Sequence, residues 1–376
     1  MKSLGEIFLN NIISTVTDGL GSITLDRPEA LNALCPEMIE GLTEVLEKWR
    51  NDPSVDAVAI RGSNKKGPFG AFCAGGDIRF FHRASCAGDT ALDDFFTAEY
   101  RLNHIICTYP KPYIAFMDGI VMGGGMGLSQ GASLRIVTER TKMAMPETNI
   151  GLFPDVGAGI FLSRCPGASG EYLALTGQLL IGGDALAVGL ADNIANSEDL
   201  DDHWRCLADP ALGDMPQRLE YLQKQLTKRA PTTTEPVWLQ QPIDVIFALD
   251  SVTDITDRLA EMGAGWPAET LEILRQRSPL MLHVTLEQIR RGRHMNLEDD
   301  LRMERDLVQH CFYTRHLARS GISSETVEGI RALAIDKDHS PAWNPPTIAQ
   351  VTSQMVAPFF ASPWSPAEHP LADLGG

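Results

Sequence analysis

The stretch that decides the fold runs from residue 110 to residue 159 and reads PKPYIAFMDGIVMGGGMGLSQGASLRIVTERTKMAMPETNIGLFPDVGAG. A short apolar segment, Tyr113–Met117, leads into a turn and then into three consecutive glycines, Gly123–Gly125. Because glycine has no side chain, a ligand can lie directly against the N–H groups of such a turn. If a helix begins there, its unpaired N–H groups and its dipole favour developing negative charge. The stretch therefore predicts a backbone oxyanion hole.

Two carboxylates, Glu147 and Asp155, stand among apolar neighbours near the end of this stretch. Burial would raise the pKa of Glu147 and suit it to base or nucleophile work. Simpler interpretations also exist: Glu147 as a first helical residue after Pro146, and Asp155 as a turn or N-cap residue. The two carboxylates together, beside a glycine turn, favour an acid/base site.

A second glycine pair, Gly75-Gly76, follows another predicted strand. Two such turns can aim backbone N–H groups at one point, and each donor of this kind is worth about 10²–10³ in rate. Tight turns needed only for close strand–helix packing explain the same glycines. From the glycines alone, both interpretations stand.

The segment Gly127-Leu128-Ser129-Gln130-Gly131 matches the G-x-S-x-G motif of serine hydrolases. The serine of G-x-S-x-G must occupy the turn between a strand and a helix. Gly123–Gly125 already occupy that turn, so we expect Ser129 inside the following helix as a packing residue. No histidine lies between Ser129 and His203. Leu128 also occupies the last position of G-x-G-x-x-G, so a dinucleotide-binding fingerprint is not formed.

Strand and helix patterns alternate over the first part of the chain, which predicts an α/β class with mostly parallel pairing. Asp77 is a candidate helix N-cap. The predicted strands are Ile7–Val16, Gly21–Leu25, Val55–Ile60, Tyr113–Met117 and Leu134–Val137, and the predicted helices are Pro36–Trp49 and Ala91–Cys107.

After Asn196 the composition shifts, and we expect a core over residues 1–200 followed by a mainly helical region over residues 201–376. The acidic run Glu198–Asp202 and the breaker-rich Arg229–Pro236 are predicted to be connecting loops. The predicted helices beyond them are 216–228, 242–250, 253–261, 267–277, 281–291 and 297–317.

The bulk composition narrows the classes of partner. The chain of 376 residues carries 49 acidic and 32 basic residues, a formal net charge of -17, which argues against nucleic acid or an anionic membrane as the main partner. Its seven cysteines are scattered without a CxxC pair and are expected to be reduced thiols. Without a signal-peptide pattern or a long apolar span, the sequence predicts a soluble, cytoplasmic protein.

Five separated motifs stand out along the chain. In chain order they are Ile23–Leu34 (ITLDRPEALNAL), Phe72–Ile78 (FCAGGDI), Gly119–Gly125 (GIVMGGG), Ala144–Gly157 (AMPETNIGLFPDVG) and Glu328–Asp338 (EGIRALAIDKD). Together they resemble the crotonase (enoyl-CoA hydratase/isomerase) superfamily, and the last two are similar to its 3-hydroxyisobutyryl-CoA hydrolase branch. The resemblance implies a core built as a spiral of ββα turns that binds acyl-CoA, and it covers roughly residues 5–345.

The resemblance also implies roles for particular residues. The N–H groups of Gly76 and Gly124 become the oxyanion hole, and Glu147 becomes the nucleophile or the base that activates water. Gly127 stands where hydratases carry a second glutamate, and Asp155 stands where they carry glycine, as in the hydrolase branch. Further substrate-binding positions fall on Glu99, Gly75, Phe72, Ala30 and Lys337, with Arg331 as another candidate cation.

The expected function is hydrolysis of a short 3-hydroxyacyl-CoA thioester, with 3-hydroxyisobutyryl-CoA (valine catabolism) as the leading candidate. The alternatives are an enoyl-CoA hydratase or isomerase of the same fold, and an acyl-CoA-binding protein without catalysis. No cofactor or metal is expected, because no ligand-spaced cluster of acidic residues with histidines occurs. The chain is expected to be a monomer or a homo-oligomer.

Overall fold

The computed structural model describes residues 3–375, and the contacts between residues divide them into two compact units, each made of several segments. The first unit holds the chain up to Gly76, Leu102–Met143 and Leu179–Pro236. The second holds Asp77–Arg101, Ala144–Gln178 and the chain from Val237 onward. The predicted boundary at residue 200 follows the order of the sequence and stays a prediction.

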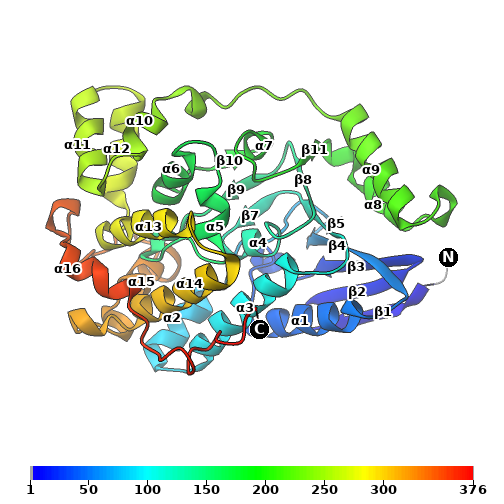
Figure 1. Cartoon of the computed structure of the whole chain (residues 1–376), viewed down its shortest axis with the longest axis horizontal. Coiled ribbons are helices and arrows are strands. Elements are labelled where there is room, and N and C mark those ends of the chain that lie inside the picture. The colour runs from blue at the N-terminus through cyan, green and yellow to red at the C-terminus, as the bar shows by residue number, and fades with distance from the viewer. Residues whose placement is uncertain (1–2, 376) are drawn as a thin grey trace. The chain divides into compact units, whose positions relative to one another are not determined.

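The first unit is built on a large sheet that begins antiparallel and continues parallel (Figure 1). β1 pairs with β2 and β2 with β3 in antiparallel fashion, and the pairings from β3 through β4, β6 and β8 to β11 are parallel. This confirms the predicted α/β class with mostly parallel pairing. The strands are β1 (Ser3–Leu9), β2 (Ile12–Thr17), β3 (Gly19–Leu25), β4 (Val55–Asn64), β6 (Tyr113–Met117), β8 (Leu134–Thr138) and β11 (Asn193–Ala195), with β5 (Gly67–Pro68) paired to β4.

The single strand predicted over Ile7–Val16 is wrong, because a tight turn divides it into β1 and β2. Asn10 and Asn11 adopt φ of 50° and 63°, a left-handed conformation that asparagine tolerates better than most residues. A smaller sheet of three short strands completes the strands of this unit: β7 (Ile120–Met122), β9 (Lys142–Ala144) and β10 (Leu180–Ile181).

Helices pack on this sheet through apolar faces. α1 (Pro36–Arg50) buries Met38, Ile39, Leu42, Val45 and Leu46, as its spacing predicts. The acidic run Glu198–Asp202 is not a loop: it forms a 3₁₀ turn and the first turn of α8 (Leu200–Leu207), where the helix dipole favours carboxylates. The other helices of the unit are α4 (Gly124–Gly127), α7 (Asp184–Ala187) and α9 (Met215–Arg229).

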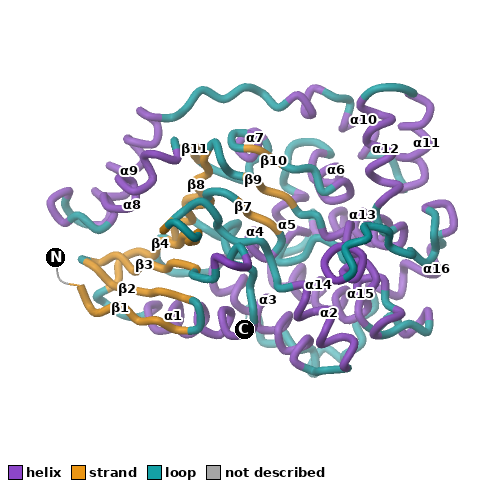
Figure 2. Tube along the Cα trace, turned by 180° about the vertical axis from the view of Figure 1, so that it is seen from behind, coloured by secondary structure: helices purple, strands orange, loops and turns teal. Residues whose placement is uncertain are grey.

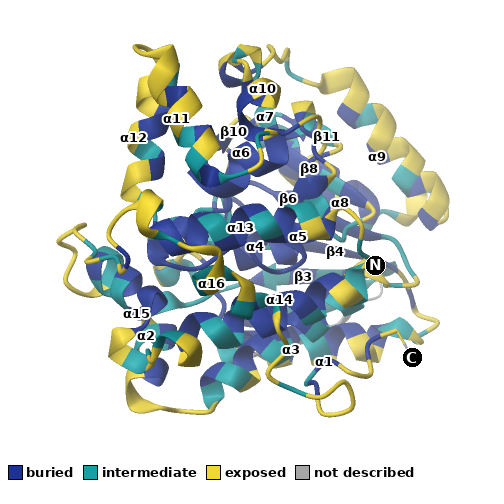
Figure 3. Cartoon of the chain, turned by 60° about the vertical axis from the view of Figure 1, so that its left-hand side comes forward, coloured by how far each residue is buried: buried dark blue, intermediate teal, exposed yellow. Residues whose placement is uncertain are grey.

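The second unit consists almost entirely of helices and loops (Figure 2). Its α13 is buried on most sides and contacts both α5 and α6 (Figure 3), so it forms the centre of the unit. The helices are α2 (Ile78–Ala87), α3 (Ala91–Cys107, which continues into the first unit), α5 (Ala158–Ser163), α6 (Ser169–Thr176), α10 (Ile243–Phe247), α11 (Val252–Met262), α12 (Trp266–Gln276), α13 (Pro279–Gly292), α14 (Leu297–Phe312), α15 (Glu325–Ile330) and α16 (Ser353–Val356).

Most helix predictions for this unit are confirmed within a few residues. Asp77 caps α2 by accepting hydrogen bonds from the N–H groups of Arg79 and Phe80. The helix predicted to reach Leu317 ends earlier, at Phe312, and a separate 3₁₀ turn covers Arg315–Leu317. Within residues 3–375 we find no helix that is long and apolar enough to cross a membrane.

The chain beyond residue 340 is fastened to the helices of the second unit. The Trp343 indole N–H donates to the Gln276 carbonyl over 3.1 Å. Farther along, the Ser362 hydroxyl donates to Asp306 over 2.7 Å, and Asp373 pairs with Arg101 at 2.6 Å. The tail therefore holds α3, α12 and α14 at three separate points.

Glu325, at the start of α15, joins this tail to the helical core. Its carboxylate accepts from the Asn344 N–H over 2.8 Å and bonds the hydroxyl of Ser278, the N-cap of α13. Burial raises the pKa of Glu325 to about 7, despite these donors. A carboxyl group at the junction of three segments therefore resists ionisation.

The first prediction concerns the pH dependence of stability. The pKa of Glu325 is about 7 in the folded protein and about 4.3 in an unfolded chain, so its contribution to stability is present at low pH and is lost as the pH rises through 7. The loss between pH 5 and pH 8 is about 2–3 kcal/mol. Glu325→Gln should therefore flatten the fall of Tm between pH 5 and pH 8, measured by thermal unfolding.

Glu328→Gln on the same helix is the control. Hydrogen bonds from Arg331 lower the pKa of Glu328, so it stays ionised over this range, and its removal should not change the slope. Equal slopes for wild type and Glu325→Gln would contradict the assignment.

Candidate functional site

The two predicted glycine turns lie side by side in the first unit. The strand-like segment at Cys73 pairs with Val121 in a parallel bridge, which aligns the two turns that follow. Gly75 adopts φ of 94°, and a Cβ atom there would lie 3.0 Å from the Met122 carbonyl oxygen and 3.5 Å from the Gly124 nitrogen. Glycine is thus required both for the backbone conformation and for the close approach.

The triplet starts a short helix. Gly123 is its N-cap, with φ of 49°, and α4 begins at Gly124, so the amide of Gly124 belongs to the unpaired first turn. Ser129 lies just beyond α4 and not inside it, fully buried, where its hydroxyl donates to the Gly125 carbonyl over 3.0 Å. This contact agrees with a packing role for Ser129.

Glu147, in the second unit, is buried at the first position of a 3₁₀ turn that follows Pro146. Glu147 therefore opens a helical turn after a proline, and it is buried as expected, while its role as base or nucleophile stays a prediction. Its Oε2 atom has no hydrogen-bond partner among residues 3–375. Burial first, and then the charge of Asp155, raise the pKa of Glu147 well above its usual range.

Asp155 lies near Glu147 and is bonded to a tyrosine. The Tyr100 hydroxyl donates to Asp155 Oδ2 over 2.8 Å. Burial raises the pKa of Asp155 to about 6, and the bond from Tyr100 limits the rise. Of the two carboxyl groups, Asp155 is therefore the one that ionises first as the pH increases.

Glu99 is a third buried carboxyl group, beside Tyr100 on α3. Within the described part of the chain, its Oε1 atom lacks a hydrogen-bond partner. Burial first, then the charges of Asp155 and Glu147, raise its pKa well above the usual range. The three carboxyl groups thus interact electrostatically, and burial together with their neighbours' charges makes Glu99 and Glu147 harder to ionise than free glutamates.

The backbone beside Asp155 is unusual. Val156 adopts φ of 60°, in the left-handed region that β-branched residues rarely enter, and Gly157 follows with φ of 90°. Strained conformations of this kind persist only where the surroundings hold them. Here Glu304 of α14 bonds the Gly157 amide over 2.8 Å.

The remaining candidate residues differ in exposure. Phe72 is fully buried, and its carbonyl accepts from the Asn32 side chain over 3.2 Å. Ala30 closes a 3₁₀ turn and is partly exposed. Lys337 is exposed with φ of 59°. Arg331 forms ion pairs with Glu328, Asp336 and Asp338. Its positive charge is therefore already neutralised and is not available to a phosphate.

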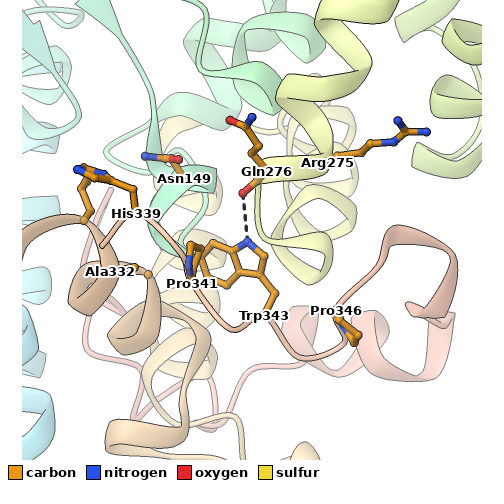
Figure 4. Close-up of a pocket in the computed structure, with 10 residues that line it drawn as sticks. Asn149, Arg275, Gln276, Ala332, His339, Pro341, Trp343 and Pro346 are labelled. Atoms are coloured by element: carbon orange, nitrogen blue, oxygen red, sulfur yellow. Dashed lines mark hydrogen bonds between the residues drawn. The ribbon is translucent and has the colours of Figure 1, made fainter. Parts of the chain in front are cut away.

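A pocket of about 440 Å³ lies against the turn that carries Glu147 (Figure 4). Asn149 lines one wall, and Trp343 lies opposite, with its indole nitrogen bonded to the Gln276 carbonyl. The lining also includes Gly329 of α15, where a Cβ atom would lie only 2.3 Å from the Ile150 carbonyl carbon. α15 therefore packs tightly against the Glu147 turn.

Sequence reasoning missed three side chains that act on the Asp155 turn: Tyr100, Gln288 and Glu304. Each is far from Asp155 in the chain, and each has the pattern of an ordinary helical residue. Among residues 3–375 no group of three or more His, Cys, Asp or Glu residues is arranged to hold a metal ion. The expected absence of a metal stays a prediction.

Comparisons with known proteins agree with this architecture. The model of a family described as enoyl-CoA hydratase/isomerase matches residues 20–360. A Danio rerio protein named "3-hydroxyisobutyryl-CoA hydrolase, mitochondrial" is 42% identical over 91% of this chain and 87% of its own length. The Homo sapiens protein of that name is 37% identical over 91% and 86%.

Solved structures give the same fold. A structure from Mycobacterium thermoresistibile, described as a carnitinyl-CoA dehydratase, has a TM-score of 0.81 at 37% identity and covers 93% of this chain and 96% of its own. One from Rhodobacter sphaeroides 2.4.1, described as an enoyl-CoA hydratase, has a TM-score of 0.80 at 35% identity, with coverage of 94% and 97%. The crotonase-like core with a helical C-terminal region is confirmed.

The expected cytoplasmic location is wrong by the same comparison, because the similar curated proteins are named mitochondrial. The physical reason is that the sequence argument excluded only the secretory route and membrane spans. Reduced cysteines and an acidic surface fit either compartment equally well.

The second prediction concerns Asp155. Tyr100→Phe removes the hydrogen bond that stabilises the ionised carboxylate, so the pKa of Asp155 should rise from about 6 by about one unit, the equivalent of one hydrogen bond. Carboxyl ¹³C NMR titration measures this shift. Tyr113→Phe is the control, because the buried Tyr113 hydroxyl bonds no other residue that the structure describes. An unchanged Asp155 titration in Tyr100→Phe would contradict the assignment.

Proposed function

Because this chain belongs to the enoyl-CoA hydratase/isomerase family, we propose that it hydrolyses the thioester of a short 3-hydroxyacyl-CoA, with 3-hydroxyisobutyryl-CoA as the leading substrate. Relatives named as hydrolases of that ester are 37–42% identical over about nine-tenths of the chain. The observation that carries the proposal is the buried pair Glu147 and Asp155, combined with Gly127, which has no carboxylate to form the hydratase pair.

The glycine turns would supply electrostatic stabilisation. As the thioester carbonyl is attacked, negative charge develops on its oxygen. The N–H groups of Gly76 and Gly124 would donate to that oxygen, and fixed backbone donors lower the barrier because they need no reorganisation. The left-handed turn at Gly75 and the helix start at Gly124 support this role.

Glu147 would act on the carbonyl carbon by one of two routes. In the first, its carboxylate attacks, the C–S bond breaks, and a mixed anhydride remains until water hydrolyses it to the free acid and Glu147. In the second, Glu147 removes a proton from water as the water attacks. A single turnover in ¹⁸O-labelled water distinguishes them, because only the anhydride route can place the label in Glu147.

Asp155 and Glu99 would serve the remaining polar groups of the substrate. The departing thiolate needs a proton, and the 3-hydroxyl group needs a hydrogen-bond partner. Asp155, with a pKa of about 6, can accept from the hydroxyl when ionised or deliver a proton when neutral. Glu99 is fitted to contact the substrate because one of its oxygens is buried and unpartnered.

The CoA moiety would be held by residues outside the carboxylate set. Ala30, Phe72 and Gly75 are proposed to line its path, and Lys337 is proposed to face its phosphates. Lys337 suits this role better than Arg331, because Arg331 is already paired with three carboxylates.

A hydratase or isomerase is the second candidate, since the two solved structures at 35% and 37% identity bear hydratase and dehydratase names. A third candidate is an acyl-CoA-binding protein without catalysis. A free-thiol assay over a panel of CoA esters separates them: hydrolysis releases thiol, hydration of crotonyl-CoA only changes the enoyl absorbance, and a binding protein does neither.

The third prediction concerns Glu147. Glu147→Gln keeps the shape of the side chain but removes the nucleophile or base, so kcat for thiol release should fall by about 10²–10⁴-fold. CoA-ester binding, measured by calorimetry, should change little. Glu269→Gln, an exposed carboxylate of α12, is the control and should retain full activity. Near-wild-type thiol release by Glu147→Gln would overturn the assignment.

The fourth prediction is a pH profile. Glu147 must be ionised to act, and the charge of Asp155 helps to raise its pKa. Asp155→Asn removes that charge, so the acid limb of kcat for the residual activity should move to lower pH by about one unit. Asp299→Asn, an exposed change on α14, should leave the limb in place. A limb that moves to higher pH in Asp155→Asn would contradict this.

A further inference from the structure

We propose that Glu304 is a positioning residue for Asp155, and that with Gln288 it holds the Pro154–Gly157 turn in the one conformation that presents the Asp155 carboxylate to the substrate. This inference rests on the proposed function and extends it to a helix outside the predicted site. Glu304 lies on α14, which is about 150 residues from Asp155 in the chain.

Glu304 binds the backbone on the C-terminal side of Asp155. Its Oε2 atom accepts from the Gly157 amide over 2.8 Å, and its Oε1 atom accepts from the Gly159 amide over 3.2 Å. Both amides belong to the unpaired start of α5. The carboxyl group of Glu304 thus does for α5 what an N-cap residue does within its own chain segment.

Gln288, on α13, binds the other side of Asp155. Its Nε2 atom donates to the Pro154 carbonyl over 2.6 Å and to Glu304 Oε1 over 3.2 Å. Gln288 and Glu304, which are bonded to each other, therefore bind the backbone at Pro154, immediately before Asp155, and at Gly157, two residues after it. Because Gln288 and Glu304 are almost fully buried, water does not compete for these bonds.

The backbone conformation of Val156 explains why the Pro154–Gly157 turn has to be held on both sides. Val156 must keep φ of 60°, which a β-branched residue leaves readily unless its neighbours are fixed. If Val156 relaxed, the direction of the Asp155 side chain would change and its bond from Tyr100 would be lost. Fixing Pro154 and Gly157 removes that freedom.

Asp300 completes the arrangement one helical turn earlier on α14. It accepts from the Ile160 amide over 3.2 Å, and a Cβ atom at Gly159 would lie 2.0 Å from its Oδ1 atom. Burial first, and then the charges of Asp300 and Asp155, raise the pKa of Glu304 well above its usual range. The charged or titratable groups that face them are Asp155, Tyr100 and Arg164.

A double-mutant cycle tests the inference. Both oxygens of Glu304 accept hydrogen bonds, so Glu304→Gln turns one acceptor into a donor that faces an N–H group. We expect kcat for thiol release to fall about 10–100-fold with KM within about threefold. In the Asp155→Asn background the same substitution should cost less than about threefold, because the group that it positions has already lost its function.

A purely structural role would give a different result. If Glu304→Gln lowers kcat by the same factor in the wild-type and Asp155→Asn backgrounds, while circular dichroism and Tm stay near wild type, the inference is overturned. Asp299→Asn, which removes a charge from the exposed face of the same helix, should change kcat in neither background.

A second variant covers the case in which Glu304→Gln does not fold. Gln288→Met removes the donor to Pro154 without adding charge, and the same dependence on Asp155 is expected. Equal losses in the two backgrounds for Gln288→Met would reject the inference equally well.

A readout without catalysis separates this inference from the proposed function. If the wild-type protein releases no thiol from any ester, the proposed function fails. The titration of Asp155 by carboxyl ¹³C NMR still decides the positioning role: Glu304→Gln should weaken the Tyr100 bond and raise the pKa of Asp155 above about 6. An unchanged titration would overturn it.

Discussion

The cost of burying carboxyl groups is the constraint on which the second unit depends. Glu99, Glu147, Asp155, Asp300 and Glu304 all lie in the interior, where the charged form is strongly disfavoured and each group raises the pKa of its neighbours. The structure offsets this cost selectively. Asp155 accepts a hydrogen bond from the Tyr100 hydroxyl. Glu304 accepts hydrogen bonds from two backbone amides and from the side-chain amide of Gln288. Glu99, Glu147 and Asp300 each keep one oxygen without a hydrogen-bond partner among residues 3–375, and buried groups left unsatisfied in this way are often found at functional sites.

In the first unit the important feature is backbone geometry, because the sheet fixes the direction of main-chain N–H groups. A parallel bridge holds the segment at Cys73 beside Val121, next to the parallel strands of the sheet. The two glycine turns that follow these segments are therefore also held next to each other. Because the donors are main-chain N–H groups, their direction depends on strand register and on glycine conformations, and it does not depend on rotamers. Within the first unit, the sheet thus fixes the direction of these backbone dipoles.

Much of this could be predicted from sequence, for identifiable reasons. Apolar runs such as Tyr113–Met117 give strands directly, and the Ala144–Gly157 motif carries both Glu147 and Asp155 in one short window. Tyr100 and Glu304 could not be found in this way, because they lie 55 and 149 positions from Asp155 along the chain. Neither a tyrosine nor a glutamate on a helix marks such a long-range contact in the sequence. The run Glu198–Asp202 was misassigned because acidity alone does not distinguish a loop from a helix start. The compartment was misassigned because the sequence features considered are shared by cytosolic and mitochondrial proteins.

The fastened tail has a practical consequence for anyone who handles this protein. α15, which packs against the Glu147 turn at Gly329, is also the helix whose Glu325 holds the chain at Asn344, and Asp373 is tied back to Arg101 only two residues from Glu99. Truncations, affinity tags and fusion partners placed at this end are therefore not neutral choices. Removing the last few residues would free Arg101 and loosen the helix that carries Glu99 and Tyr100, far from the cut in sequence but adjacent to it in space.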